Sequence, residues 1–466
     1  MSTGVAHYDA IVIGAGQGGG PLAGAFAKAG LRTLIVERSH VGGTCINEGC
    51  TPTKTMIASG RVAYLARRAT DYGVLTGTIA VDLAAVRDRK RRIVDSFRGG
   101  SERALERAGV ELRMGAARFT GPRAIAIETA DGVASAATAE VIVINTGLRP
   151  QSPNIQGLPD VPSLDSTSIM ELDEIPPHLI VLGGGYVGVE FAQLFRRLGS
   201  AVTLVHRGAQ LLAREDSDIA EAIAYVLRQD DIDIWLKTTT TQAAHTAAGG
   251  VTLNVRSADG RTAEISGSHL LVATGRRPNT DGLDTQTAGV ALDKDGYVVV
   301  NQRLETSAPG VYAIGDVNRG PAFTHIAYDD FRILRTNLLN HGHASTEGRV
   351  LPYTVFTDPQ LGRVGLTEAE ARAAGFDVQV ASMPMSSVAR ALETDESRGI
   401  MKAVVDRATR KILGAAVLGI EGGEIASLIQ VAMMGGLPFT SLRDGVFSHP
   451  TLAESLNNLF KGLTDE

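Results

Sequence analysis

The chain has 466 residues, of which 44% are hydrophobic and 21% charged, a globular composition with enough length for about three domains. Its formal net charge of -6 gives no basic field to attract a phosphate backbone, so nucleic acid is not an expected partner. No apolar run reaches the roughly 18 residues of a membrane span and no basic region precedes the first apolar run, so we expect a cytoplasmic protein with no membrane partner.

The first predicted elements surround a glycine turn. Residues 11–38, IVIGAGQGGGPLAGAFAKAGLRTLIVER, predict a strand, a turn, an amphipathic helix and a second strand. The spacing of Gly14, Gly16 and Gly19 closes such a turn, lets the backbone approach a pyrophosphate and packs the helix on its strand. At the end of the second strand, Glu37 is placed to bind a free ribose 2'-hydroxyl. The segment therefore predicts an FAD site.

The only two cysteines of the chain follow this unit. Cys45 and Cys50 lie five residues apart in residues 42–54, GGTCINEGCTPTK. In an ideal helix such residues have Cα atoms about 8 to 9 Å apart, beyond the roughly 7 Å limit for a disulfide. The pair can close only if the start of the helix is distorted, for which Gly49 and Pro52 supply the means. Because a helix N-terminus also stabilises a thiolate, we interpret the pair as reactive.

A second copy of the glycine pattern begins at residue 180. Residues 180–207, IVLGGGYVGVEFAQLFRRLGSAVTLVHR, align without gaps on residues 11–38. The glycines of this copy are Gly183, Gly185 and Gly188. Two glycine patterns in register, each between strands, indicate two dinucleotide sites far more specifically than one pattern would.

The two copies differ at the end of the second strand. Where the first copy has Glu37, the second has His206, followed by Arg207, with Arg214 a short way on. An acid at this place binds a free ribose 2'-hydroxyl, whereas a cation accepts a 2'-phosphate. We therefore expect the second site to favour NADPH over NADH; the alternative is a solvated strand end.

Three later segments are predicted to be strands that return to these sites. Residues 141–147 (VIVINTG) would close the FAD unit and residues 270–275 (LLVATG) the NADPH unit. Residues 310–316 (GVYAIGD) place Asp316 just past a buried strand, where it can accept hydrogen bonds from ribityl hydroxyls or cap a helix. Further residues expected at the cofactor sites are Gly43, Thr44, Thr146, Gly147 and Gly275.

The order of these markers predicts an α/β fold. It comprises two Rossmann-type dinucleotide-binding domains, for FAD (1–150 and 275–347) and NADPH (151–274), plus a C-terminal α+β dimerisation domain (348–466). In the last domain we expect an antiparallel sheet suited to subunit contact. Its strand-like and helical runs are 352–356, 399–405, 411–418, 424–435 and 452–463.

Together these motifs resemble the class I pyridine nucleotide-disulfide oxidoreductases, the family of glutathione reductase, dihydrolipoamide dehydrogenase and mercuric reductase, over essentially the whole chain. The resemblance implies that Cys50 is the charge-transfer thiol against the flavin and Cys45 the interchange thiol that meets the substrate. It also implies that Lys54 lies near flavin N5, paired with Glu190. Tyr186 would be the gate over the nicotinamide pocket.

Residues 449–454, HPTLAE, resemble the HPTxxE motif of this family. The resemblance implies that His449 is the acid-base for the interchange thiol and that Glu454 orients its ring. A histidine suits this task because its pKa lies near neutrality. In the family this histidine reaches the cysteines of the other subunit, so a homodimer with shared active sites is implied.

The electron acceptor is less well specified. Residues 144–150 (INTGLRP), 323–332 (FTHIAYDDFR) and 448–460 (SHPTLAESLNNLF) resemble mercuric reductases and reactive-chlorine-resistance flavoproteins. Mercuric reductases use a further C-terminal cysteine pair, however, and this chain ends KGLTDE. We therefore expect an NADPH-linked reductase without a resident metal site, whose acceptor is a metal ion, an oxidant-derived electrophile or a small disulfide.

Two alternatives stay open. The first is a dihydrolipoamide dehydrogenase, which His206 argues against because those enzymes generally carry an acid there. The second is a regulatory flavoprotein, whose cysteine pair senses oxidants without useful turnover.

Overall fold

The computed structural model describes residues 5–246 and 249–464. The chain forms two compact units, each made of segments far apart in the sequence. Unit 1 contains the residues up to Thr55, Ala85–Gln151 and Gly275–Arg349, and unit 2 contains Met56–Ala84, Ser152–Thr274 and the residues from Val350 on. In the described part of the chain, every helix is too short or too polar to cross a membrane.

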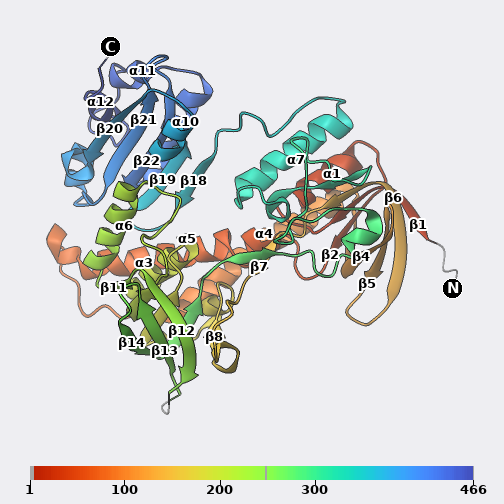
Figure 1. Ribbon diagram of the computed structural model, residues 1–466, viewed down its shortest axis with the longest axis horizontal. Coiled ribbons are helices and arrows are strands. Elements are labelled where there is room, and N and C mark those ends of the chain that lie inside the picture. Colours follow the sequence, from red (N-terminus) through yellow and green to blue (C-terminus); the bar gives the residue numbers. More distant parts are fainter. Residues whose placement is uncertain (1–4, 247–248, 465–466) are drawn as a thin grey trace. The chain divides into compact units, whose positions relative to one another are not determined.

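A seven-stranded sheet lies at the centre of unit 1 (Figure 1). Its order is β3-β2-β1-β6-β5-β4, and β17 also pairs with β6. β1, β2, β3, β6 and β17 are parallel, whereas β4 and β5 are antiparallel. The strand bounds are β1 Ala6–Ile13, β2 Thr33–Glu37, β3 Glu111–Met114, β4 Ala116–Gly121, β5 Ala124–Glu128, β6 Ala134–Ile144 and β17 Val311–Ala313. The predicted return of residues 141–147 to the first strand is confirmed, since Ala10 pairs with Val141.

Helices cover one face of this sheet. α1 (Gly19–Lys28) and α7 (Thr324–Leu339) pack together, and Phe26 and Phe331 share an apolar cluster with Val12 of β1. Its neighbours Ile11 and Ile13 belong to the cluster on the opposite face, as the alternation of a strand requires. The remaining elements that begin or lie in this part are α2 Gly43–Asn47, α3 Cys50–Arg67, α4 Leu83–Ala108, β7 Leu148–Pro150 and β16 Arg276–Pro278.

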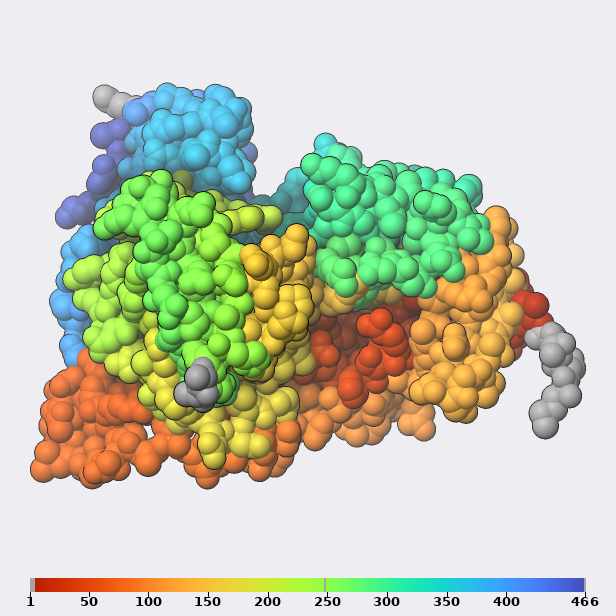
Figure 2. Space-filling model, turned by 60° about the horizontal axis from the view of Figure 1, so that its bottom comes forward, coloured from red at the N-terminus to blue at the C-terminus, as the bar shows by residue number. Residues whose placement is uncertain are grey.

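Unit 2 contains a second parallel sheet, of order β11-β10-β9-β15-β8. β15 runs parallel to β9, with Leu270 beside Ile180, which confirms the second predicted return. The elements are β8 Ser163–Leu164, β9 His178–Leu182, α5 Tyr186–Leu198, β10 Ala201–Val205, α6 Ser217–Gln229, β11 Ile232–Trp235 and β15 His269–Val272. A three-stranded antiparallel sheet of β12 (Thr238–His245), β13 (Val251–Ser257) and β14 (Thr262–Gly267) lies at the surface of this unit, green in Figure 2.

The residues from Val350 on form the predicted α+β part with an antiparallel sheet, of order β18-β19-β22-β21-β20. The elements are β18 Pro352–Val355, β19 Gln360–Gly365, α8 Glu368–Ala373, β20 Val378–Pro384, α9 Ala389–Glu393, β21 Ile400–Asp406, β22 Ile412–Gly419, α10 Gly422–Met434, α11 Phe439–Arg443 and α12 Ser455–Phe460. The helix expected at 452–463 was predicted too long: the chain turns before it, where Ser455 N donates to Leu452 O, and α12 ends at Phe460.

Short 3-10 helices connect many of these elements. Their bounds are η1 Ala69–Tyr72, η2 Leu158–Asp160, η3 Ser168–Glu171, η4 Thr285–Ala288, η5 Gly315–Asn318 and η6 Met385–Ser387.

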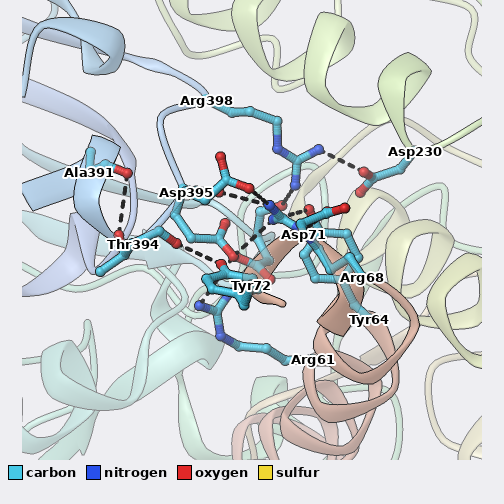
Figure 3. A network of polar contacts seen from close by, with 12 residues as sticks. Arg61, Tyr64, Arg68, Asp71, Tyr72, Asp230, Ala391, Thr394, Asp395 and Arg398 are labelled. Carbon is cyan, nitrogen blue, oxygen red and sulfur yellow. Dashed lines mark hydrogen bonds and ion pairs between the residues drawn. The ribbon is translucent and has the colours of Figure 1, made fainter. Parts of the chain in front are cut away.

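An ionic network joins three segments of unit 2 (Figure 3). Arg68, at the end of α3, pairs with Asp395 and, at 3.3 Å, with Glu396. Arg398 pairs at 2.7 Å with Asp230, which follows α6. Because the side chains of Glu396 and Asp230 are only 4% and 8% exposed, removal of one partner would leave a charge without compensation. The network therefore fixes how these segments of unit 2 pack.

Candidate functional site

The first glycine turn leaves no room for side chains. Gly14 has a φ of 101°, and a Cβ atom there would lie 2.4 Å from the carbonyl oxygen of Asn145. A Cβ atom at Gly19 would lie 2.4 Å from the carbonyl oxygen of Gly14. At Gly16, it would lie 2.8 Å from the Asn145 amide nitrogen. The turn thus presents bare backbone at the start of α1, as pyrophosphate binding requires.

Glu37 holds this turn in place. Its carboxylate accepts hydrogen bonds from the backbone N–H groups of Ala15 and Ser39, both at 2.8 Å. A carboxylate has about four acceptor positions, so Glu37 retains capacity for the hydroxyls of a ribose. Its predicted role at the adenosine of FAD is compatible with this geometry.

The cysteine segment packs against the same turn. Gly42 and Gly43 both have positive φ angles, of 104° and 63°, and α2 begins at Gly43. A Cβ atom at Gly43 would lie 2.8 Å from the Cα of Gly16. Backbone therefore meets backbone at this point, and Thr44 and Cys45 follow directly on α2.

The two cysteines lie on different helices. α2 ends at Asn47 and α3 begins at Cys50, so the helix is interrupted between the cysteines, as the geometry of a disulfide demands. Gly49 lies at the interruption, where a Cβ atom would meet the carbonyl oxygen of Thr44 at 3.0 Å. Cys45 is half-buried, whereas Cys50 is exposed.

The surroundings of the two thiols differ. A hydrogen bond with Cys50 and burial raise the pKa of Cys45. The hydroxyl of Thr324, at the start of α7, lies 3.4 Å from the Sγ of Cys50. Sequence reasoning missed Thr324 as a site residue, although it lies in the stretch 323–332 singled out for its resemblance to relatives. The hydrogen bond with Cys50 and the burial both favour the neutral thiol at Cys45.

Asp316 and Thr146 lie beside the carboxyl ends of β17 and β6. Burial raises the pKa of Asp316 to about 6, although Arg276 opposes this effect. The hydroxyl of Thr146 is buried and has no hydrogen-bond partner within the described ranges. Gly147, with a φ of 65°, has no atom within 4 Å of a Cβ position. An orphaned hydroxyl, a half-buried carboxyl and an open backbone fit a polyhydroxylated cofactor such as FAD.

The second glycine turn repeats the first in unit 2. A Cβ atom at Gly183 would lie 2.3 Å from the carbonyl oxygen of Ala273, and one at Gly188 would lie 2.0 Å from that of Gly183. At Gly185, by contrast, no atom lies within 4 Å of the Cβ position. The backbone is therefore open to a ligand at the N-cap of α5. The first helical residue, Tyr186, is 39% exposed.

The side chains at and after the end of β10 differ in hydrogen bonding and exposure. The Nδ1 atom of His206 accepts a hydrogen bond from the backbone N–H of Gly184 at 3.1 Å. Burial and the neighbouring Arg207 lower the pKa of His206. Arg207 and Arg214 are both exposed.

Three predicted site residues are divided between the units. Glu190 on α5 is buried and accepts a hydrogen bond from the backbone N–H of Phe356 at 2.8 Å. Lys54 belongs to unit 1 and Glu190 to unit 2, so their pairing stays a prediction. Gly275 belongs to unit 1, where its carbonyl accepts the backbone N–H of Gln151 at 3.0 Å.

The structure brings His449 and Glu454 together. Nδ1 of His449 lies 2.8 Å from one carboxylate oxygen of Glu454 and 3.1 Å from the other. The histidine side chain is 68% exposed. A carboxylate that holds one ring nitrogen leaves Nε2 to exchange a proton with a reacting group.

Comparisons with known proteins agree with this arrangement. Residues 8–330 match the family model of the pyridine nucleotide-disulphide oxidoreductases, and residues 351–460 match the dimerisation domain of that family. The chain is 38% identical over 458 residues to the probable pyridine nucleotide-disulfide oxidoreductase RclA of Escherichia coli, with 97% of this chain and 98% of RclA covered.

Other relatives have different activities. A mercuric reductase of Staphylococcus aureus is 35% identical, with 96% of this chain and 81% of the relative covered. A dihydrolipoyl dehydrogenase of Thermus scotoductus is 36% identical, with 96% of both chains covered. The solved Cu(II) complex of the HOCl-induced flavoprotein disulfide reductase RclA from Escherichia coli is similar with a TM-score of 0.89 and 37% identity, covering 98% of this chain and 100% of that one.

Proposed function

Because the chain belongs to the pyridine nucleotide-disulfide oxidoreductases, we propose that it is an FAD-dependent reductase that takes electrons from NADPH. They pass through Cys45 and Cys50 to a metal ion or a small disulfide. The observation that carries this proposal is the contact of Gly43 with Gly16, because it packs the start of the cysteine helix on the glycine turn of the FAD site.

The thiol environments support a division of labour between the cysteines. When bound, FAD supplies a two-electron relay between the nicotinamide and the cysteine pair. Two electrons and one proton convert the disulfide to a thiol and a thiolate. The raised pKa of Cys45 favours the protonated form of that thiol, while the hydroxyl of Thr324 can donate to the sulfur of Cys50. Cys45 must lose its proton before it attacks an acceptor.

His449 is the base that we assign to this step. Its Nδ1 is held by Glu454, which favours the tautomer with a free Nε2 and stabilises the ring once it is protonated. The match of residues 351–460 to a dimerisation domain supports a homodimer in which His449 serves the cysteines of the other subunit.

Two classes of acceptor fit this cysteine pair, of which Cys50 is exposed. The relative RclA is solved as a Cu(II) complex and others are mercuric reductases, which supports a metal ion as acceptor. In the described part of the chain, no group of three or more His, Cys, Asp or Glu side chains is placed to hold a metal ion. In this proposal a metal ion reacts at the cysteines as a substrate. We assign the enzyme to the cytoplasm, where thiols stay reduced between turnovers.

The test is anaerobic NADPH consumption by the FAD-loaded protein. Hg(II), Cu(II), glutathione disulfide and lipoamide are compared as acceptors, with NADH as the control donor. Fast turnover with a metal ion supports the metal-reductase branch, and turnover with glutathione disulfide alone supports the thiol branch. NADH-linked lipoamide turnover would instead identify a dihydrolipoamide dehydrogenase. Cysteine oxidation without NADPH consumption with any acceptor would identify a redox sensor.

A further inference from the structure

Of the two basic residues at the end of β10, His206 and Arg207, only Arg207 carries a fixed positive charge. Because Nδ1 of His206 accepts the N–H of Gly184, this nitrogen carries no proton. Burial and Arg207 also lower the pKa of this ring, so His206 is neutral at pH 7. A phosphate monoester carries a charge of about -1.5 to -2 at this pH. Arg207 alone would leave much of that charge without compensation.

Two further segments of unit 2 lie beside Arg207. The backbone N–H of Lys237 donates to the carbonyl of Gly208 at 2.8 Å, and that of Thr238 donates to the carbonyl of His206 at 3.0 Å. The backbone N–H of Ala258 in turn donates to the carbonyl of Lys237 at 2.9 Å. Backbone hydrogen bonds therefore hold the β11–β12 turn and the β13–β14 turn against the end of β10.

These segments line one open pocket of about 460 Å³, which we call the cationic pocket. Its charged side chains are those of Arg207, Lys237 and Arg256. Arg256 pairs across the sheet with Thr239, which also lines the pocket. All three cations are exposed, and within residues 5–246 and 249–464 none of them forms an ion pair with a carboxylate. Three uncompensated positive charges around one hollow favour an anionic ligand.

We propose that Lys237 and Arg256 act with Arg207 to bind the 2'-phosphate of NADPH. This inference rests on the proposed function, since it names the residues that set the nucleotide preference of that reductase. The ligand class is a phosphate monoester on an adenosine ribose, and the hydroxyl of Thr239 supplies a further donor. NADH gains nothing from the pocket, because its 2'-hydroxyl is neutral. Arg214, which was expected at this site, is not among the side chains that line the pocket.

The test measures binding to the FAD-loaded protein by calorimetry, without turnover. The probes are 2',5'-ADP, 5'-AMP and inorganic phosphate. Lys237→Gln and Arg256→Gln should each weaken 2',5'-ADP binding by about tenfold, as expected for loss of a charge-assisted contact. Binding of 5'-AMP should change by less than about twofold, because the substitutions leave the adenosine and its 5'-phosphate untouched.

Arg261→Gln is the matched control. Arg261 lies on the same hairpin as Arg256, is 84% exposed on its side chain, and pairs with Asp259 outside the pocket. Its substitution removes the same charge and should leave the affinity for 2',5'-ADP unchanged. Inorganic phosphate should compete with 2',5'-ADP in the wild type and much less in Lys237→Gln, if the pocket recognises the phosphate itself.

The outcomes separate this inference from the proposed function. If Arg207→Gln weakens 2',5'-ADP while Lys237→Gln and Arg256→Gln do not, NADPH use stands and the inference is overturned. Equal losses of 2',5'-ADP affinity in Arg261→Gln and Arg256→Gln would also overturn it. They would indicate a general effect of positive charge on this hairpin and no specific contact in the cationic pocket. A wild-type protein that binds 2',5'-ADP and 5'-AMP equally would refute the NADPH preference itself.

Discussion

The contact between Gly43 and Gly16 is open to a quantitative test by Gly43→Ala. Alanine at a φ of 63° costs about 1 to 2 kcal/mol relative to glycine. The new Cβ atom would also lie 2.8 Å from the Cα of Gly16, and backbone cannot rotate away as a side chain can. Overpacking of this kind typically costs a further ~1 to 3 kcal/mol of stability. We expect a total destabilisation of about 2 to 5 kcal/mol.

A second glycine separates the two contributions. Gly109 also has a positive φ, of 79°, but no atom lies within 4 Å of its Cβ position. Gly109→Ala should therefore show the conformational cost alone, about 1 to 2 kcal/mol. Urea unfolding followed by circular dichroism gives the stabilities, and flavin fluorescence gives the fraction of FAD released.

Gly43→Ala should also release FAD at lower urea concentration than Gly109→Ala, because the overlap displaces the turn that holds the pyrophosphate. Equal stability and equal FAD retention in the two variants would refute the reasoning. The cysteine segment would then not be held by close contact with the glycine turn.

Three further predictions concern the reacting groups. Cys50→Ser should abolish the long-wavelength absorption of the NADPH-reduced enzyme; persistence of the band would assign the flavin contact to Cys45. His449→Ala should slow acceptor turnover by a factor of about 10² to 10⁴, while the rate of flavin reduction by NADPH, measured by stopped flow, stays the same. Equal losses in both rates would contradict a role of His449 as a base. In the FAD-free protein, the raised pKa of Asp316 means that the folded state binds more protons than the unfolded one between about pH 4 and pH 6. Stability should fall as pH rises through this window, and Asp316→Asn should flatten the fall in urea titrations.

The parts of this site that were predictable from the sequence are those fixed by local geometry. Gly19 and Gly188 are required by close approaches to the carbonyl oxygens of Gly14 and Gly183, each within a single βαβ unit, so their spacing alone indicates the turn. The interruption between the cysteines was predictable in the same way, because the reach of a disulfide is a local constraint.

Contacts between distant segments were not predictable in this way. Thr324 lies 274 residues from Cys50, and no periodicity relates the two. Lys237 and Arg256 reach the end of β10 only because two turns of unit 2 are hydrogen-bonded to it and to each other. The sequence showed a basic pair at His206 and Arg207, and the number of fixed charges there could be read only once the hydrogen bond of His206 was known.

That hydrogen bond also explains how the two repeats can share one turn and differ in charge. Ala15 and Gly184 occupy matching positions, as do Glu37 and His206. In each copy, the backbone N–H of the turn donates to the side chain at the end of the second strand: Ala15 to Glu37 at 2.8 Å and Gly184 to His206 at 3.1 Å. The turn needs an acceptor at this position in both copies.

A carboxylate meets that need at the cost of a negative charge, which a ribose hydroxyl tolerates and a 2'-phosphate does not. Neutral imidazole is an acceptor without that charge. His206 therefore preserves the geometry of the second turn while it removes the repulsion that a carboxylate would impose. Because the ring must stay neutral to accept the N–H of Gly184, it cannot also act as the counter-charge. Positive charge beyond that of Arg207 then has to come from side chains outside the repeated unit, which is where Lys237 and Arg256 lie.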